Sequence, residues 1–449
     1  MTNCFQHSLF VLAHSLGQPD FYPVYKRLLK NQWKPLAELK AEQDTQLRRM
    51  VHFCYDNVPY YHTLFQNQRI KPETIKTTND LKKIPVLTKE IIKANWEELK
   101  PVNLNRIRFQ MHSTGGSTGT PMKYRVSSND RFLAGALLYR GWGYAGYKLS
   151  DKMVFLAGSS LDIGTKVELV KKAHEYTRNI RKLSSFNMGE KEMQSYAGVL
   201  NTFQPKYIRG YASSIYFFAQ WLEENNIRIP FPNAVFTTAE KLYPPMRETI
   251  GRVFNCEVFD GYGLFDGGVS AYECPEHSGL HIDSERSVME LIDEGGNVIE
   301  SGEGTILATS LHNFAMPFLR YDTGDIATRA EDPCSCGRAY PLLSEIVGRS
   351  VDVLITPEGT KVHGWFFLYI FWEHGEGIKE YQVVQETINE IKIKIVKEEK
   401  FNEQKLDIIR KIILSKSPDW NISFNFVDEI KRTKSGKYKF IINEVSVNG

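Results

Sequence analysis

The chain lacks several features that mark special classes of protein. Its formal net charge at pH 7 is only +3, with 56 Lys and Arg against 53 Asp and Glu in 449 residues. A nucleic-acid-binding surface would be strongly basic and clustered, so we expect no nucleic-acid partner. No apolar run approaches the ~20 residues that a membrane-spanning helix requires, and we expect no membrane span.

An export signal and a disulfide scaffold are also missing. No basic segment precedes the short apolar run at residues 8–16, so we expect no signal peptide and a cytoplasmic location. Six cysteines are too few for a disulfide scaffold in a chain of this length. In the reducing cytosol, paired cysteines favour a metal site over a disulfide.

Short apolar runs alternate with helical patterns in the middle of the chain. The spacing of apolar residues predicts helices over 36–58, 128–144, 214–224 and 245–254. The second of these helices has Ser128 or Asn129 as its expected N-cap. Apolar runs predict buried strands at 153–156, 207–208, 234–236 and 258–259. Such alternation is typical of an α/β core with a largely parallel sheet.

The pattern changes twice further along the chain. After about residue 285, runs at 288–292 and 304–308 flank turn signals and predict an antiparallel β region. Beyond Gly348-Arg349, a strand at 391–396, a helix at 404–414 and a strand at 422–427 predict a small α+β domain. We therefore expect an N-terminal domain at 1–348 and a C-terminal domain at 349–449.

A glycine- and hydroxyl-rich loop is the most informative motif. It reads Ser113-Thr114-Gly115-Gly116-Ser117-Thr118-Gly119-Thr120-Pro121, and Lys123 follows closely. Glycines let a ligand approach the backbone, whose N–H groups hold anions together with hydroxyl donors. The loop predicts phosphate binding, although no Gly-Lys-Ser/Thr ends it as in a Walker A loop. The alternative is a flexible linker.

Two acidic glycine-rich segments follow. The segment 259–268 comes after an apolar strand and contains Tyr262, Gly263 and Asp266, whose carboxylate suits Mg²⁺. The segment 320–325 ends in Asp325, a carboxylate that can accept both hydroxyls of a ribose. The alternatives are an ordinary glycine-rich turn and a hairpin tip.

A basic turn, Arg432-Thr433-Lys434-Ser435-Gly436-Lys437, lies near the C-terminus. A cation on a small terminal domain could reach a site on the larger domain, and the alternative is a solvated basic loop.

Taken in order, these segments resemble the motifs of the adenylate-forming superfamily of acyl-CoA synthetases, ligases and peptide-synthetase adenylation domains. The resemblance covers roughly residues 105–445. Asn57-Val58-Pro59-Tyr60-Tyr61 and Gly210-Tyr211-Ala212-Ser213 are similar to the phenylacetate–CoA ligase-like branch. That branch also includes proteins associated with capsular polysaccharide biosynthesis.

The resemblance implies a fold and a set of roles. The fold would be a large adenylate-forming domain with α/β layers and a β subdomain, followed by a small mobile α+β domain. Residues 113–121 with Lys123 would bind the ATP phosphates, Asp325 would bind the ribose, and Asp266, where the family has Glu, would bind Mg²⁺. Tyr262 and Gly263 would lie near adenine or the acyl group, and Glu240 would lie by the adenine. Arg349 would belong to a hinge element with Asp352 as its pivot, and Lys437 would serve adenylation.

The implied reaction is ATP-dependent and AMP-forming. A carboxylic acid would become an acyl-adenylate, and the acyl group would pass to CoA. Transfer to an amine, giving an amide, is the alternative acceptor chemistry, for example in surface polysaccharide modification. A different class also stays open, that of a non-catalytic relative serving as a binding subunit. A homodimer is compatible with each of these functions.

Three cysteines and a histidine predict a metal site. Cys274-Pro275-Glu276-His277-Ser278-Gly279-Leu280-His281 is followed by Cys334-Ser335-Cys336-Gly337. Three thiols and an imidazole suit a closed, structural zinc site in an insertion near 274–336. The alternatives are unrelated buried thiols, or His277 as the ligand in place of His281. Relatives carry a similar set in which a β-branched residue follows the histidine, which favours His281. Cys4, Cys54 and Cys256 are expected to be isolated and mostly buried.

Overall fold

The structure is a computed structural model that describes residues 4–113, 122–157, 168–185, 188–349, 353–433 and 438–445. Internal contacts divide the chain into two units, Met1–Val347 and Gly348–Gly449, which are described separately below. Within the described residues, no helix combines the length and the apolar character needed to cross a bilayer.

Helices form the N-terminal part of the first unit. The predicted helix over 36–58 is α3, whose buried face carries Leu39, Leu47 and Met50. Pro59 starts the next helix, a position where its missing N–H costs nothing. The elements are α1 (Cys4–Ser15), α2 (Phe21–Asn31), α3 (Leu36–Asn57), α4 (Pro59–Asn67) and α5 (Lys89–Ala94), with short 3₁₀ turns η1 (Pro72–Thr74), η2 (Thr78–Lys83) and η3 (Leu104–Arg106).

A parallel sheet occupies the middle of the chain, as predicted. In the described residues its five strands follow the order β4-β3-β5-β6-β7, and every neighbouring pair is parallel. The strands are β3 (Met153–Ala157), β4 (Ile180–Ser184), β5 (Tyr207–Tyr211), β6 (Ala234–Thr238) and β7 (Glu257–Phe259). The helices between them are α7 (Glu168–Arg178), α8 (Glu190–Phe203), α9 (Ala212–Glu224) and α10 (Pro244–Phe254).

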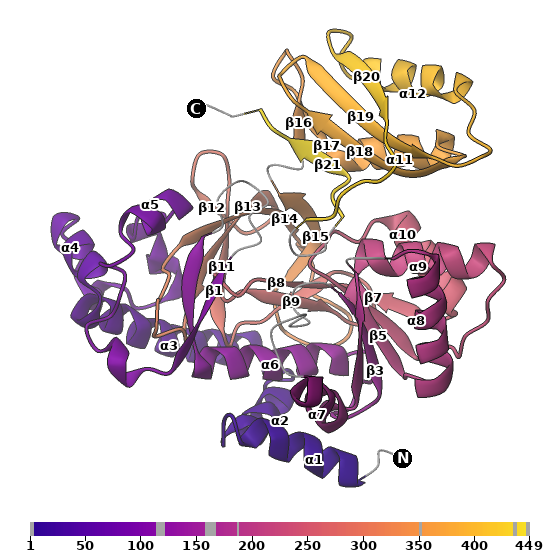
Figure 1. Ribbon diagram of the computed structural model, residues 1–449. Helices are drawn as coiled ribbons and strands as arrows, with labels where there is room; N and C mark the ends of the chain where they lie inside the picture. Colours follow the sequence, from indigo (N-terminus) through magenta and orange to yellow (C-terminus); the bar gives the residue numbers. More distant parts are fainter. Residues whose placement is uncertain are drawn as a thin grey trace. The chain divides into compact units, whose positions relative to one another are not determined.

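Helices cover both faces of this sheet. Figure 1 shows α8, α9 and α10 grouped on one side of it, and α9 packs against β3 and β5. Helix α6 (Ser128–Gly143) covers the other side, where Trp142 stacks on Phe236. Helix α2 also packs against α6, so α6 contacts both the parallel sheet and an N-terminal helix.

The expected N-cap of α6 is wrong, because the cap lies one residue before Ser128 and two before Asn129. The hydroxyl of Ser127 accepts the N–H of Asp130 at 3.4 Å, in place of Ser128 or Asn129. Ser127 is the last residue of β2 (Lys123–Ser127) and keeps an extended backbone, as an N-cap residue requires. The strand therefore passes directly into the helix without a linker.

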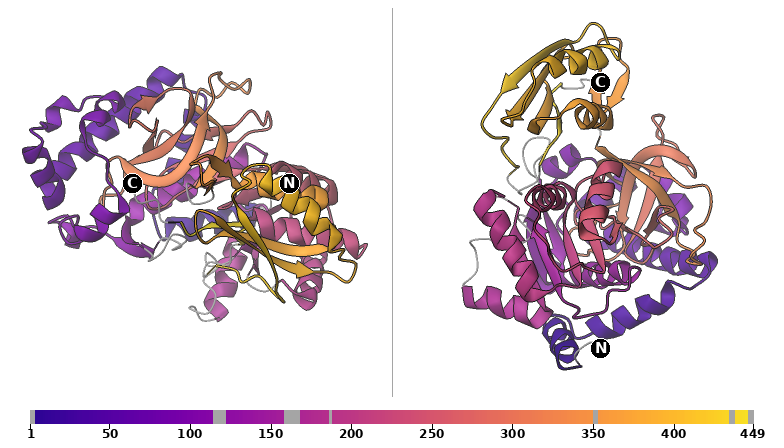
Figure 2. Two further views of the ribbon diagram at one scale, coloured as in Figure 1. Left: turned by 90° about the horizontal axis from the view of Figure 1, so that it is seen from above. Right: turned by 90° about the vertical axis from the view of Figure 1, so that its right-hand side faces the viewer.

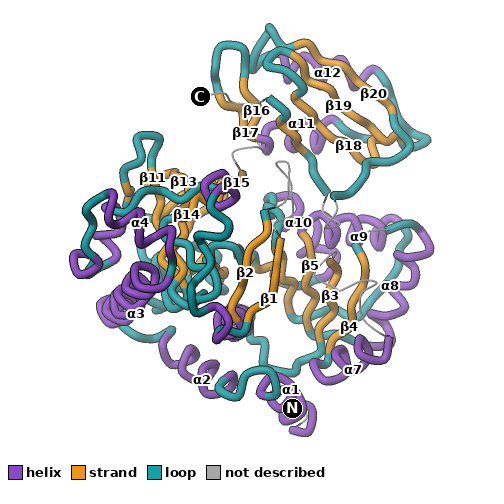
Figure 3. Tube along the Cα trace, turned by 60° about the vertical axis from the view of Figure 1, so that its left-hand side comes forward, coloured by secondary structure: helices purple, strands orange, loops and turns teal. Residues whose placement is uncertain are grey.

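An antiparallel ribbon flanks the predicted phosphate loop. Strand β1 (Phe109–Ser113) pairs with β2, and the register places Ser113 opposite Lys123 (Figure 3). The ends of the segment between these two residues are thereby held side by side.

A second, antiparallel sheet confirms the predicted β region. In the described residues it has the order β12-β11-β13-β14-β15-β10-β9-β8. Figure 2 shows these strands, in salmon to orange, in two further views. Its strands are β8 (Gly261–Gly263), β9 (Ser270–Glu273), β10 (Leu280–Ile282), β11 (Ser287–Ile292), β12 (Val298–Ile299), β13 (Gly302–Ser310), β14 (Tyr321–Arg329) and β15 (Leu342–Arg349). Its buried side chains share one apolar core with α3 and α4.

The second unit is a small α+β domain with its own core. Alternating Ile391, Ile393 and Ile395 of β19 are fully buried and pack with Ile409 and Ile413 of α12. The sheet order is β20-β19-β18-β21, and β16 pairs with β17. The elements are β16 (Val353–Ile355), β17 (Lys361–His363), α11 (Gly364–His374), β18 (Ile378–Gln385), β19 (Glu390–Lys397), α12 (Gln404–Leu414), β20 (Asn421–Phe426) and β21 (Ile441–Asn443).

The three remaining cysteines differ in exposure. Cys54 is buried as expected, but Cys256 is half-buried and Cys4 is exposed. Cys4 is the first residue of α1, whose buried residues Phe10 and His14 lie further along the helix, so the expectation that it is buried was wrong.

A neutral histidine holds α1 in place. His14 is 6% exposed and stacks between Phe10 and Phe21. Its Nδ1 donates to the carbonyl of Phe10 at 2.9 Å, which leaves Nε2 to accept the hydroxyl of Tyr139 at 3.1 Å. Burial, with a smaller contribution from Arg178, lowers the pKa of His14 to about 4.

This lowered pKa predicts that mild acid weakens the protein. His14 is neutral in the folded state and takes up a proton more readily when unfolded, so its contribution is complete above pH 6.5 and is lost as the pH falls towards 4. The loss should reach at most about 3 kcal/mol of unfolding free energy. Urea unfolding at pH 7.5 and 5 measures it. His14→Gln should be weaker at pH 7.5 and should show a smaller drop than the wild type. An equal drop in both proteins would contradict the assignment.

Candidate functional site

Polar residues follow the carboxyl ends of β6 and β7, the edge where open α/β sheets bind ligands. Ala239 comes directly after β6 and has φ of +65°, a conformation that is uncommon for a non-glycine residue. Glu240 follows, and its Oε2 accepts the backbone N–H of Ser213 at 2.9 Å. Ser213 lies in the first turn of α9, where a carboxylate is stabilised by the helix dipole. The strained turn therefore fixes Glu240 at the edge of the sheet.

A hydrogen bond joins two of the predicted motifs. The hydroxyl of Tyr262, on β8, donates to Oδ2 of Asp325, on β14, at 2.8 Å. Burial, and after it the charge of Asp325, raises the pKa of Tyr262 well above its usual value, so the hydroxyl keeps its proton. Asp325 is 5% exposed, and Tyr262 orients its carboxylate. The predicted role of Tyr262 beside adenine or the acyl group stays a prediction.

Asp266 lies close to this pair. Its Oδ2 accepts the hydroxyl of Tyr321 at 2.9 Å. Burial foremost raises the pKa of Asp266, and the charge of Asp325 adds to the rise. A half-buried carboxylate beside a buried one favours a nearby cation, and hard oxygen ligands of this kind suit Mg²⁺. The side chains present thus fit the implied ion.

Two cations near this region carried no signal in the sequence. Lys89, the first residue of α5, donates to the carbonyl of Thr323 at 3.3 Å, and its charge lowers the pKa of Asp266. Arg286 pairs with Asp130 at 2.7 Å and donates to the carbonyl of Leu264 at 3.4 Å. Lys89 lies 234 positions before Thr323, and Arg286 lies 22 positions after Leu264, beyond β9 and β10, so no local pattern could identify them.

The glycines of this segment have a packing role. A Cβ on Gly267 would lie 2.6 Å from Cβ of Ala308, a distance that real side chains do not reach. Glycine at this position lets the loop that carries Asp266 lie against β13.

The structure describes only some of the remaining predicted residues. Ser113 and Lys123 face each other at the open end of the β1–β2 ribbon, and Gly263 pairs with Ser270 on β9. Arg349 ends β15, and its side chain is not described. The following predicted residues lie outside the described residues: Thr114, Gly115, Gly116, Ser117, Thr118, Gly119, Thr120, Asp352 and Lys437.

The four predicted metal ligands are brought together. One donor atom from each of Cys274, His281, Cys334 and Cys336 lies within 4.8 Å of the others. Sγ of Cys274 is 3.6 Å from Sγ of Cys334, and Sγ of Cys336 is 3.4 Å from Nε2 of His281. Tetrahedral zinc with Zn–S of about 2.3 Å separates two sulfurs by about 3.8 Å. The spacing therefore fits a closed four-ligand site.

Strand pairing explains this arrangement. Cys274 follows β9 and His281 lies on β10, which pairs with both β9 and β15. Cys334 and Cys336 lie in the loop that leads into β15, where Gly337 turns the chain with φ of +83°. Four ligands from two distant segments thus meet beside the neighbouring strands β9, β10 and β15.

His277 lies apart from this cluster. Its Nδ1 is 3.5 Å from Oε2 of Glu273, and Arg247 lies beside it. Burial lowers the pKa of His281 to about 4, with a further contribution from Arg338, so its imidazole is neutral as a metal ligand must be.

Comparisons with known proteins show what this chain resembles in sequence and in fold. Residues 354–444 match the family described as the CapK C-terminal domain. The chain is 26% identical over 438 residues to protein CapK of Staphylococcus aureus, which covers 95% of this chain and 92% of CapK. It is 25% identical over 397 residues to phenylacetate-coenzyme A ligase of Thermus thermophilus, covering 82% of this chain and 83% of the ligase.

A solved structure extends the likeness to the fold. The crystal structure of 2-hydroxyisobutyryl-CoA ligase in complex with R3-HIB-AMP has a TM-score of 0.72 at 18% identity, covering 92% of this chain and 91% of that one. These matches confirm the predicted resemblance to the phenylacetate–CoA ligase-like branch of the adenylate-forming enzymes, the fold class and the prediction of a ligase. The roles of individual residues stay predictions.

The cysteine cluster predicts one zinc per chain. We expect elemental analysis of purified protein to find it, and His281→Ala to lose it while His277→Ala keeps it. Because a thiolate site contributes to folding, metal removal should lower the melting temperature. With no ligand position left for water, adenylation should not require the metal. Metal-free protein with three freely alkylated thiols under native conditions would contradict the site.

Proposed function

Because the chain is a homologue of CapK and of the phenylacetate-coenzyme A ligases, we propose that it is an ATP-dependent, AMP-forming carboxylate ligase. The observation that carries the proposal is the hydrogen bond from Tyr262 to Asp325. It joins the two motifs to which the resemblance assigns adenine and ribose contacts, next to the strand end that carries Glu240. A shared nucleotide site explains why residues 63 positions apart meet there.

In the first step, a carboxylate oxygen of the acid attacks the α-phosphorus of ATP. The bond to the β-phosphate oxygen breaks, pyrophosphate leaves, and an acyl-adenylate remains. Asp325 would accept the ribose hydroxyls, residues 113–121 and Lys123 would bind the phosphates, and Asp266 would hold Mg²⁺. The ion, when bound, offsets phosphate charge in the transition state. We assign to Lys437 the cation that bridges the attacking carboxylate and the phosphate.

In the second step, we propose CoA as the acceptor. The sulfur of CoA attacks the acyl carbon, AMP leaves, and the thiol proton passes to solvent. The names of the relatives support a thiol over an amine acceptor. Rotation about Asp352, a hinge motion of the second unit, would exchange the groups that serve the two steps.

A panel of carboxylic acids tests the proposal. Pyrophosphate release with ATP and Mg²⁺ should appear for at least one acid, and AMP and a thioester should follow when CoA is added. Formation of a thioester after CoA is added supports CoA as the acceptor. Pyrophosphate release that CoA does not affect, together with amide formation when amines are added, would make an amine the acceptor. No release with any acid would favour the non-catalytic alternative, for which the change from Glu to Asp266 is the one sign in the sequence.

The terminal lysine gives a sharp prediction. Lys437→Ala should abolish pyrophosphate release while leaving the circular dichroism spectrum unchanged, because adenylation needs a cation at this position. Lys434→Ala is the matched control from the same basic turn and should keep most of the activity. Near wild-type release in Lys437→Ala would overturn the assignment.

Asp325 should determine ATP affinity. Asp325→Ala should weaken ATP binding about tenfold to a hundredfold, since a hydrogen bond to a charged group is worth about 1.5–3 kcal/mol. Its effect on the KM for the acid should be smaller. Tyr262→Phe is the control, because it removes the orienting hydroxyl and keeps the carboxylate, so it should weaken ATP binding less. Titration calorimetry with ATP and Mg²⁺ measures both, and unchanged affinity in Asp325→Ala would show that this residue only forms a turn.

A further inference from the structure

An arginine lies among aromatic side chains on one face of the parallel sheet. The register places Arg209 of β5 beside Phe155 of β3 and Phe236 of β6, and Phe259 of β7 is the next residue of the row. Residues in register on neighbouring strands share a face of the sheet. Trp142 of α6 covers this face and stacks on Phe236. Arg209 is therefore enclosed between a helix and a sheet, in surroundings that are otherwise aromatic.

Two rings hold the guanidinium of Arg209 in place. Its Cζ lies 5.4 Å from the centroid of the Trp142 ring and 5.4 Å from that of the Phe155 ring, as in cation–π contacts. The side chain is half-buried, and Nε is the enclosed nitrogen, without a hydrogen-bond partner among the described residues. The terminal nitrogens Nη1 and Nη2 are thus the donors that a ligand can reach.

In the part of the chain that the structure describes, no carboxylate balances the charge of Arg209. Burial lowers the pKa of Arg209, and the groups that act against this effect are the side chains of Tyr272, Tyr211 and Tyr139. Lys182, in register with Phe155 on the edge strand β4, is a second cation. An enclosed charge without a partner is unfavourable, so an anion beside Arg209 would be stabilised.

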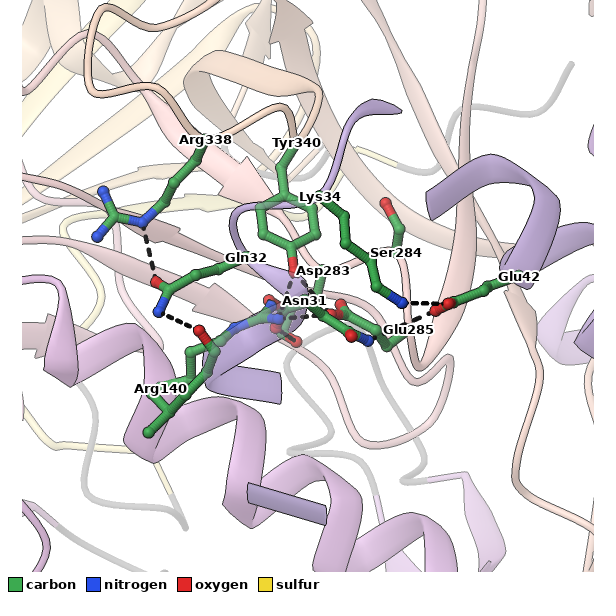
Figure 4. Close-up of polar contacts among 12 residues, drawn as sticks. Asn31, Gln32, Lys34, Glu42, Arg140, Asp283, Ser284, Glu285, Arg338 and Tyr340 are labelled. Atoms are coloured by element: carbon green, nitrogen blue, oxygen red, sulfur yellow. Dashed lines mark hydrogen bonds and ion pairs between the residues drawn. The ribbon is translucent and has the colours of Figure 1, made fainter. Parts of the chain in front are cut away.

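Arg140 shows how the same protein treats another enclosed arginine. It lies on α6, the helix that covers Arg209, and pairs with both Asp283 and Glu285 (Figure 4). These two carboxylates are therefore engaged with Arg140. The contrast indicates that the counter-ion of Arg209 comes from outside the chain.

A small cavity lies beside Arg209 at the carboxyl end of the sheet. Thr238, the last residue of β6, and Gly261 also line it. Glu240 lies two positions after Thr238, and Tyr262 follows Gly261, so the cavity borders the candidate site. Its volume of about 10 Å³ holds about one water molecule. The group that reaches Arg209 must therefore be compact, such as an oxygen of a carboxylate.

Two carboxylates in the wall of this cavity have partners of their own. Asp260 accepts the hydroxyl of Thr237 at 2.6 Å, and Glu273 pairs with Arg247 at 2.7 Å. Neither is among the groups that affect the pKa of Arg209. The positive charge of Arg209 thus stays available to a ligand.

We propose that Arg209 selects acids that carry a second carboxylate, so that the substrate is a dicarboxylic acid. One carboxylate accepts hydrogen bonds from the terminal nitrogens of Arg209, and the aromatic row packs against the body of the acid. The other carboxylate is left to react with the nucleotide. This inference rests on the proposed function, because it takes the acid to bind beside the nucleotide.

Titration calorimetry with matched acids tests the inference without requiring turnover. The full chain would be titrated in the presence of Mg²⁺ and the α,β-methylene analogue of ATP, whose α–β bridge resists cleavage. Succinate, glutarate and adipate would be compared with butyrate, pentanoate and hexanoate. At least one diacid should bind about tenfold or more tightly than the monoacid of equal length, since it adds a charge-assisted hydrogen bond. Equal binding within every pair, or no binding of any acid, would overturn the inference.

Arg209→Met separates recognition from stability. The variant removes the charge and keeps an unbranched side chain between Trp142 and Phe155. The preference for the diacid should disappear and the affinity for the monoacid should stay, while the melting temperature stays the same or rises because an unpaired charge is lost. A lower melting temperature with an unchanged preference would show that Arg209 is only structural and would overturn the inference.

Two further variants check that the effect comes from a charge at this position. Arg209→Lys keeps the charge and should keep part of the preference for the diacid. Arg181→Met is the matched control on β4, where Arg181 lies over Phe203 outside the cavity, and it should keep the full preference. Loss of the preference in Arg181→Met as well would contradict the assignment to Arg209.

Pyrophosphate release with ATP distinguishes this inference from the proposed function. A diacid that depends on Arg209 for binding but causes no release would contradict the ligase activity and leave the selectivity intact. Release with monoacids as fast as with the matched diacids would contradict the selectivity and leave the ligase activity intact.

Discussion

The buried ion pairs of Arg140 connect the main parts of the first unit. Arg140 lies on α6 and is 0% exposed, and its guanidinium is held by Asp283 and Glu285 between β10 and β11. Asp283 also accepts the hydroxyl of Ser270 on β9, and Glu285 accepts that of Tyr340 from the loop with Cys334 and Cys336. Removing one partner of a buried pair costs about 3–5 kcal/mol, so this cluster fixes α6 against the antiparallel sheet. Helix α6, strand β9 and the loop that carries Cys334 and Cys336 are therefore joined through the same two carboxylates.

Local patterns in the sequence predicted most of the regular elements. The parallel strands carry continuous apolar runs, and the amphipathic helix at 404–414 has the bounds of α12. Strand β4 was missed because its sequence, Ile180-Arg181-Lys182-Leu183-Ser184, places two charged residues in a half-buried edge strand. The cap of α6 was misplaced because a strand that passes directly into a helix leaves no turn signal.

Residues of the candidate site could be predicted only where they lie within a recognisable sequence motif. Asp266 and Asp325 were identifiable as carboxylates after glycine-rich turns, and the cysteine spacing indicated a metal site. Tyr321 belongs to the segment 320–325, but its contact with Asp266 forms only when β14 packs against the loop that follows β8. Lys89, on α5, lies in no motif that the sequence offers. The ion pairs of Arg140 join residues more than 140 positions apart, and no local pattern reports them.

Oxygen transfer tests the central claim, that the chain activates a carboxylate as an adenylate. Carboxylic acids labelled with ¹⁸O in the carboxylate, phenylacetate first, would be incubated with the protein, ATP, Mg²⁺ and CoA, and the AMP analysed by mass spectrometry. Attack of the carboxylate on the α-phosphorus leaves one of its oxygens on AMP, so the account predicts AMP that carries a single ¹⁸O. Unlabelled AMP, or label found in inorganic phosphate, would contradict it.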